Sequence, residues 1–179
     1  MAKHKISVPL TQQGIRQLQS ELDKYMDDIK YKARDLAEKL SERGITVMQC
    51  HISESPLGKY VSVKTDITPE MAGCRAALIA TGQTMESDGY APFNTLLAIE
   101  FGAGIHHNKI PNPNADKFGL GVGTFPGQIH AFEDYWFYWD EEEQKWLPTH
   151  GVRATMPMYN ASMAIASDVV KIAKEVFDK

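Results

Sequence analysis

The sequence predicts a single α+β domain in which a long N-terminal helix and a C-terminal helix pack on a mostly antiparallel β-sheet, with a long Gly/Pro-rich loop. Three observations predict this fold. Apolar residues recur every three or four positions at both ends of the chain, the middle alternates apolar and polar residues, and residues 103–129 are too rich in glycine and proline for a regular element. With 179 residues the chain is long enough to bury one core of its own.

The composition is that of a folded globular protein, with 43% hydrophobic and 23% charged residues. A formal net charge of -4 argues against a surface built to neutralise DNA phosphates, so sequence-specific nucleic-acid binding is not expected. The N-terminus has no signal-peptide pattern, and no apolar run is long enough to cross a bilayer. We therefore expect synthesis in the cytoplasm and no membrane partner. The two cysteines, Cys50 and Cys74, lie in apolar contexts without CxxC spacing, which predicts buried free thiols.

The first expected element is an amphipathic helix over residues 11–43. Thr11 is a good N-cap residue, and Gly44 is a good helix terminator. A helix of roughly 30 residues is about 45 Å long, which exceeds the core of a small domain. Part of its apolar stripe therefore faces either the domain's own sheet or a neighbouring subunit, and the sequence leaves both open. The stripe consists of Ile15, Leu18, Leu22, Tyr25, Ile29, Ala33, Leu36 and Leu40.

Residues 45–91 are expected to supply the first strands. ITVMQCHI at 45–52 and KYVSVKTDI at 59–67 alternate in polarity around the turn-rich SESPLG, which predicts a hairpin. CRAALIATG at 74–82 is a short apolar run, and we assign it to a strand rather than a helical turn. The next segment, APFNTLLAIEFGAG, fits either a brief helix or a strand that enters a tight turn.

The loop over residues 103–129 is rich in proline and glycine, a composition that cannot continue a regular element. Loops of this length inside a compact domain usually have a function or are disordered. Its prolines and glycines include Pro111, Pro113 and Pro126 with Gly119, Gly121, Gly123 and Gly127.

A second hairpin is expected over residues 130–149, where the aromatic run DYWFYWD and the later KWLPTH flank the turn EEEQ. The aromatic residues 135–139 occupy both faces of their strand, which favours packing in the core on both sides, with a partner surface as the alternative. The acidic residues 140–143 fit a solvated hairpin tip. A terminal amphipathic helix is then expected over residues 160–178, with Asn160 as its cap. Its apolar face would carry Ile165, Val169, Ile172 and Val176.

A catalytic reading would use Glu100, His106, His107 and His130 as metal ligands. A catalytic metal needs about three ligands directed at one point, as the HExxH pattern provides on a helix. His106 and His107 are adjacent, so they point to opposite sides of an extended segment. No GxSxG, GxxxxGK[ST] or GxGxxG pattern occurs in a fitting context, so no cofactor is expected.

Four segments carry a resemblance to a known family: AIEFGAG at 98–104, the glycine-rich loop leading to GTFPGQ, the aromatic YWFYWDE, and THGVRATMPMYNASMAI at 149–165. In this order they resemble the tail-component family of long-tailed bacteriophages, which are neck or tail-completion proteins. The resemblance spans the long N-terminal helix and nearly everything from residue 92 onward. THG followed by MPMYNA is its most specific part.

The resemblance implies a small α+β virion subunit without catalytic activity, made in the bacterial cytoplasm and built into the neck where the tail meets the head. It also implies copies assembled around the tail axis in a ring, in contact with head-closure, tail-terminator or tail-tube proteins. A ring through which DNA passes could have an acidic channel that does not grip phosphates.

The residues that would serve this assembly fall in three groups. In EFGAG, Gly102 and Gly104 permit positive φ angles, and Glu100 is expected to cap or pair locally. In THGVRATMPMYNA, a turn leads out of the hairpin and Pro157 stiffens the approach to the last helix. The loop at 105–128 is the expected interface that becomes ordered on assembly. The candidate assembly and turn residues are Glu100, Phe101, Gly102, Gly104, Gly119, Gly121, Gly123, Thr149, His150, Gly151, Met156, Pro157, Met158 and Tyr159.

Two classes of function remain open from sequence: the structural virion subunit, and a small metal-dependent hydrolase that uses Glu100 and the three histidines.

Overall fold

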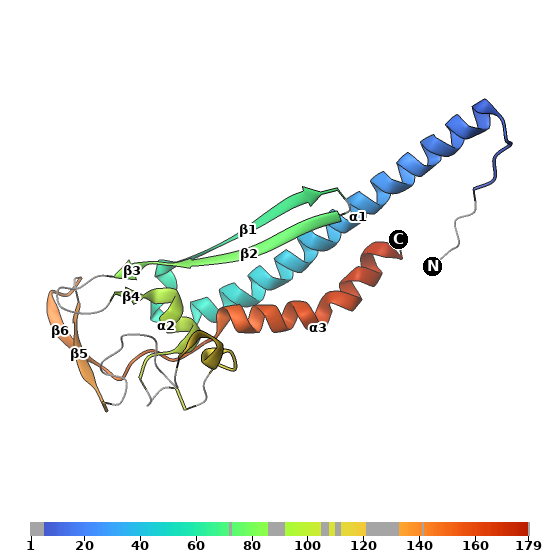
Figure 1. Cartoon of the computed structure of the whole chain (residues 1–179). Coiled ribbons are helices and arrows are strands. Elements are labelled where there is room, and N and C mark those ends of the chain that lie inside the picture. Colours follow the sequence, from blue (N-terminus) through green and yellow to red (C-terminus); the bar gives the residue numbers. More distant parts are fainter. Residues whose placement is uncertain are drawn as a thin grey trace.

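The computed structural model describes residues 6–71, 73–85, 92–104, 108–109, 112–120, 133–140 and 142–178. It is a mixed α+β fold, as predicted, and the described residues form three helices longer than one turn together with antiparallel strand pairs. The described strands form three separate two-stranded pairs rather than one continuous sheet. Figure 1 shows an elongated molecule in which the longest helix and the longest hairpin run side by side.

Helix α1 extends over Gln12–Ser53. The predicted cap is confirmed, because the Thr11 hydroxyl accepts a hydrogen bond from Gly14 N at 3.1 Å. Ion pairs spaced three or four residues apart follow its exposed side, including Asp28 with Lys32 and Arg34 with Glu38. At 1.5 Å per residue the helix is about 63 Å long.

The expected end of this helix at Gly44 is wrong, and so is the strand expected over residues 45–52. The helix continues through ITVMQCHIS to Ser53. Gly44, Met48 and Ile52 are four residues apart and all buried, so the segment also carries the spacing of a helix face. Packing of that face outweighs the strand preference of its β-branched residues.

The first hairpin is formed by β1, Val61–Glu70, and β2, Gly73–Gly82, which follow the short 3₁₀ helix η1, Pro56–Tyr60. The strands pair antiparallel from Val61 opposite Gly82 to Glu70 opposite Gly73. The strands expected over residues 59–67 and 74–82 are present, except that Lys59 and Tyr60 belong to η1. They pair with each other rather than with residues 45–52.

The segment APFNTLLAIEFGAG, which the sequence allowed to be either a helix or a strand, contains one of each. A two-residue strand β4, Phe93–Asn94, pairs with β3, Thr84–Met85, and leads into the short helix α2, Thr95–Phe101. Asn94 caps α2, because its side-chain oxygen accepts hydrogen bonds from Leu96 N and Leu97 N. The helix ends at Gly102, which has a φ of 79°.

The second hairpin is confirmed as β5, Trp136–Asp140, paired with β6, Lys145–Thr149. Helix α3 extends over Pro157–Phe177, so it begins three residues before the expected 160. Between α2 and β5 the structure describes one 3₁₀ turn, η2, Ala115–Phe118, inside the predicted loop 103–129.

The main core lies where α1, α3 and the first hairpin meet. Met48, Ile52 and Ala161 are buried there, with Val63 and Leu78 packed against them. A smaller cluster of Phe101, Ala115 and Leu120 joins α2 to η2. Both cores lie toward one end of α1. In Figure 1 the N-terminal half of α1 extends beyond α3 and the hairpin.

Candidate functional site

The carboxylate of Glu100 lies at the start of α3, far away in sequence from its own helix α2. Its two oxygens accept hydrogen bonds from Met158 N at 2.7 Å and Tyr159 N at 3.0 Å. These are N–H groups of the first turn of α3, which have no partner within their own helix. Glu100 therefore caps α3 across 58 residues of sequence, rather than locally as the sequence suggested.

Helix α3 needs this external cap because its own cap position cannot supply one. Met156 occupies that position with a φ of 53° and makes no side-chain capping hydrogen bond. Pro157 follows as the first helical residue, a favourable place for proline because no N–H is lost from the helix there. Asn160, the expected cap, lies inside the first turn and donates a hydrogen bond to Thr155 O at 3.0 Å.

Two buried asparagines hold the loop after α2 against the same structure. Asn112 donates to the Glu100 carboxylate at 2.9 Å and to Glu100 O at 3.2 Å. Asn108 donates to Gly104 O and Val152 O, and it accepts from Ala154 N at 2.7 Å. The loop and the segment that leads from β6 to α3 are thereby joined through amide groups whose hydrogen-bonding capacity is used inside the protein.

The backbone completes this contact. Ala103 and Val152 exchange two hydrogen bonds, at 2.9 and 2.8 Å, in an isolated antiparallel bridge. Gly151 has a φ of 104°, and a Cβ there would lie 1.8 Å from Ala103 O. At Gly102 a Cβ would lie 2.2 Å from the side chain of Asn108. These two glycines allow the two segments to approach as closely as the hydrogen bonds require.

Hydrogen bonds hold the THG segment at the end of β6. The Thr149 hydroxyl accepts a hydrogen bond from Gly151 N at 3.0 Å, and His150 Nδ1 lies 2.7 Å from Asp134 O. Met158 packs against the main core, and Met156 and Tyr159 are half-buried. The segments 98–104 and 149–159, which carry most of the resemblance, therefore form one structural unit.

The surroundings of Glu100 act on the pKa of its carboxyl in opposite directions. Only 6% of the residue is exposed. Burial raises the pKa of its carboxyl, and the hydrogen bonds from Met158 N, Tyr159 N and Asn112 oppose that rise. The carboxyl is thus placed to accept hydrogen bonds from protein N–H groups, which is a structural use of an acidic group.

Several predicted site residues lie outside the described part of the chain. These are His106, His107 and His130 of the proposed metal set, and Gly121 and Gly123 of the loop. Among the residues that the structure describes, no group of three metal-ligating side chains is found. Gly119 is described, and it ends η2 in the left-handed region with a φ of 69°.

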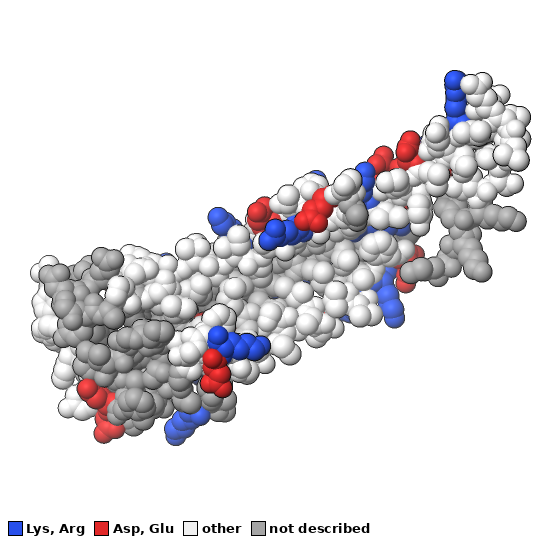
Figure 2. Space-filling view, viewed as in Figure 1, with Lys and Arg blue, Asp and Glu red and all other residues white. Residues whose placement is uncertain are grey.

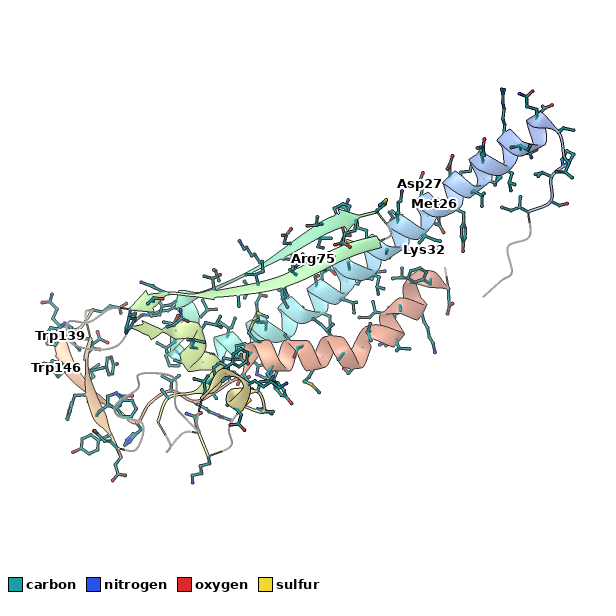
Figure 3. The ribbon with its side chains drawn as sticks, in the orientation of Figure 1. Met26, Asp27, Lys32, Arg75, Trp139 and Trp146 are labelled. Carbon is teal, nitrogen blue, oxygen red and sulfur yellow. The ribbon has the colours of Figure 1, made fainter. Side chains whose placement is uncertain are left out.

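The described surface has apolar side chains at both ends of the molecule. Along the outer half of α1 the exposed set comprises Ile15, Leu22, Tyr25, Met26, Ile29 and Tyr31. The second hairpin exposes Tyr135, Phe137, Tyr138, Trp139 and Trp146. Figure 3 shows Trp139 and Trp146 at the opposite end of the molecule from Met26.

The expectation that these aromatic residues pack in the core is therefore wrong. Phe137 is 55% exposed and Trp146 is 61% exposed. Trp139 and Trp146 pack edge to face across the strands, with ring centroids 5.7 Å apart. The two strands of the hairpin pair with each other, and most of their aromatic side chains remain exposed. Cys50 is also exposed rather than buried, although both cysteines are free as expected.

Charge is distributed without a dominant sign. Figure 2 shows acidic and basic side chains scattered over this face, and the described residues form no extended basic patch on it. Of the acidic tip expected over residues 140–143, Glu142 and Glu143 are exposed, Asp140 is half-buried and residue 141 lies outside the described residues. The Glu142 carboxylate lies 3.2 Å from Lys59 Nζ. No helix of the described chain has the length and apolarity that a membrane crossing requires.

Sequence reasoning missed the two asparagines and the long-range cap. The sequence contained only an indirect indication of this cap. Met156 and Pro157 at the start of α3 have no polar side chain that could cap the helix, so a polar group from elsewhere in the chain was required. Glu100 is the one charged residue in the apolar run TLLAIEFGAG, which made it the best candidate.

Comparisons with known proteins add no further constraint. No protein-family model, no curated protein and no solved structure matches the chain.

Proposed function

We propose that this chain is a structural subunit of a tailed bacteriophage or prophage virion, a neck or tail-completion protein at the head–tail junction. The observation that carries the proposal is the contrast between its buried polar groups and its exposed apolar groups. Glu100, Asn108 and Asn112 are used to join parts of the chain, whereas large apolar side chains at both ends remain exposed. Exposed apolar patches of this kind are typical of surfaces that another protein covers.

The resemblance of segments 98–104 and 149–165 to phage tail components supports the particular role. Those segments form the contact between α2, the following loop and α3, so the part of the chain that carries the resemblance is a joint within the subunit. In this proposal the joint fixes the direction of α3 relative to the second hairpin. Copies would assemble around the tail axis in a ring, in contact with head-closure, tail-terminator or tail-tube proteins.

The alternative, a metal-dependent hydrolase, would need Glu100 as a ligand. Both oxygens of that carboxylate already accept hydrogen bonds from N–H groups of the protein. A metal at Glu100 would displace donors that hold the start of α3. The described geometry thus supports the structural role better.

Electron microscopy of lysates tests the proposal. The gene is deleted from the phage or prophage that encodes it, and the lysate is compared with one complemented by the wild-type chain. We expect separate DNA-filled heads and tails, or tails with defective head-proximal ends, and complementation should restore joined particles. Normally joined, infectious particles from the deletion would overturn the proposal.

A further inference from the structure

Among the residues that the structure describes, the outer part of α1 has no partner helix beside it. Helix α3 runs antiparallel to α1, with Asp168 paired to Arg43 at 2.7 Å and Ile165 against Gly44. Each residue adds 1.5 Å in both helices, so Phe177 at the end of α3 lies near the level of Arg34. Residues of α1 before that level extend beyond α3 (Figure 1). We call residues 12–32 the overhang.

The overhang has a regular apolar stripe, which we call the α1 stripe. Its residues are spaced by three, four, three and four, the spacing of the a and d positions of a coiled coil. The α1 stripe continues the face on which Ala37 and Gly44 are buried against the rest of the domain. Ile15, its first residue, is 51% exposed. The α1 stripe consists of Ile15, Leu18, Leu22, Tyr25 and Ile29.

Helix α3 has a second stripe with the same spacing on its outer side. The face of α3 that includes Ala161 and Val176 is buried. On the side turned away from it, Met163 is 53% exposed and Val170 is 63% exposed. This α3 stripe consists of Met163, Ala166, Val170, Ala173 and Phe177.

The two stripes match in length and in size. Aligned in parallel from their first residues, they place Leu18 beside Ala166 and Tyr25 beside Ala173, so large side chains meet small ones. The other layers pair apolar residues, such as Leu22 with Val170. Each stripe is therefore a partner of suitable shape for the other.

The flanking residues favour the same parallel alignment. In a parallel pair, residues at g positions of one helix meet e positions of the other. This places Glu21 beside Lys174, and Met26 beside Val169, both of which are exposed apolar residues. An antiparallel alignment would instead place Glu21 near Val169 and Met26 near Ser167 or Lys174. Two overhangs paired antiparallel would bring the acidic residues Glu21 and Asp28 of both copies together.

We infer that the free chain forms a two-fold dimer in which the α1 stripe of each copy packs on the α3 stripe of the other. The partner's α3 runs parallel to the overhang, and α3 is antiparallel to α1 within each chain, so the two α1 helices are antiparallel to each other. Ile15 of one copy then lies at the level of Gly44 to Met48 of the other. By symmetry the second overhang meets the first α3, so both stripes of both copies are covered.

This dimer goes beyond the proposed function and does not depend on it. If the proposed ring of uniform polarity forms, it cannot contain this two-fold contact, so the dimer would have to open before the subunit joins a particle. The stripes that it covers become available when it opens. Its failure in solution would leave the particle experiment above unaffected, and the reverse is also true.

Disulfide trapping between the two stripes tests the inference. Leu22→Cys and Val170→Cys are introduced together into the full chain with Cys50→Ser and Cys74→Ser. Within one copy the two positions are about 30 Å apart along α1, because Val170 lies near residue 41, so an intramolecular bond cannot form. We expect a covalent dimer on mild oxidation. Leu22→Cys with Met163→Cys, shifted by one heptad, should not cross-link.

Charge reversal provides a second measurement by sedimentation. We expect Glu21→Lys or Lys174→Glu to weaken the dimer by roughly fivefold each, since each removes two flanking ion pairs, and the double variant to recover affinity. Circular dichroism checks that each variant is folded. A monomer at all concentrations, cross-linking of Leu22→Cys alone through paired overhangs, or loss of affinity without recovery in the double variant would overturn the inference.

Discussion

At the scale of single residues, Glu100 shows what the sequence can and cannot reveal. Its position in EFGAG indicated a structural role next to a glycine turn, and that role is present. The partner could not be predicted, because the N–H groups that it caps belong to residues 158 and 159. Local spacing contains no information about a contact made across 58 residues; only the tertiary fold brings the two segments together.

Glu100→Ala should destabilise the subunit by about 3 kcal/mol, because the N–H groups of Met158, Tyr159 and Asn112 would lose a charged acceptor inside the protein. Denaturant unfolding measures this change. Glu142→Ala, at the exposed tip of the second hairpin, should change stability by less than about 0.5 kcal/mol. A loss of under about 1 kcal/mol at Glu100 would show that water can replace the carboxylate as the cap.

The stability difference between the wild type and Glu100→Gln should depend on pH. Burial raises the pKa of Glu100 above its ordinary value of 4.5 in the folded state, so the folded state binds that proton more tightly than the unfolded state does. The contribution of Glu100 is therefore fully present below 4.5 and decreases as pH rises through the raised pKa. Measuring the free energy of unfolding of both proteins across this pH range isolates the effect, since the contributions of all other titratable groups cancel in the difference. A wild-type advantage that grows with pH would contradict the raised pKa.

At the scale of elements, α1 was predicted in its start and type but not in its end. Thr11 and the apolar spacing indicated where the helix begins. Gly44 suggested a stop because glycine commonly ends helices. Here it lies inside the helix, where a Cβ would come within 2.7 Å of both Ile165 and Leu78, so close packing of α3 and β2 accounts for the glycine. Sequence periodicity alone cannot distinguish a terminator from a contact position.

Gly44→Leu should destabilise the fold by about 2 to 3 kcal/mol, although leucine is the better helix former, because the side chain would force α3 and β2 away from α1. Thermal or denaturant unfolding gives the value. The matched control is Glu42→Leu, an exposed position on the same helix, which should cost little. If Gly44→Leu proved as stable as the wild type, the close approach of the three elements would be in doubt.

At the scale of the whole molecule, the sequence predicted the fold class, but it did not predict which apolar side chains are buried and which are exposed. The α+β class and both terminal helices follow from periodicity, which depends on each segment alone. The exposure of the aromatic hairpin does not, because an apolar run appears the same whether its own domain or another subunit covers it. Both ends of the described part of the molecule thus carry exposed apolar side chains.

Trp139→Ser together with Trp146→Ser should leave the subunit folded, because the hairpin lies away from both cores. The midpoint of thermal unfolding should shift by no more than a few degrees. In the complementation experiment, however, the variant should fail to restore joined particles, since it lacks the proposed contact surface. Full restoration by this variant would remove the hairpin from the assembly surface.

The most direct test of the central claim is quantitative mass spectrometry of gradient-purified particles from the phage or prophage that encodes the chain. If the chain is a subunit of the neck, it should remain with intact virions and with purified tails or heads at a fixed ratio to their structural proteins. Its absence from purified, joined particles, with the chain recovered only in the soluble fraction of the lysate, would contradict the account.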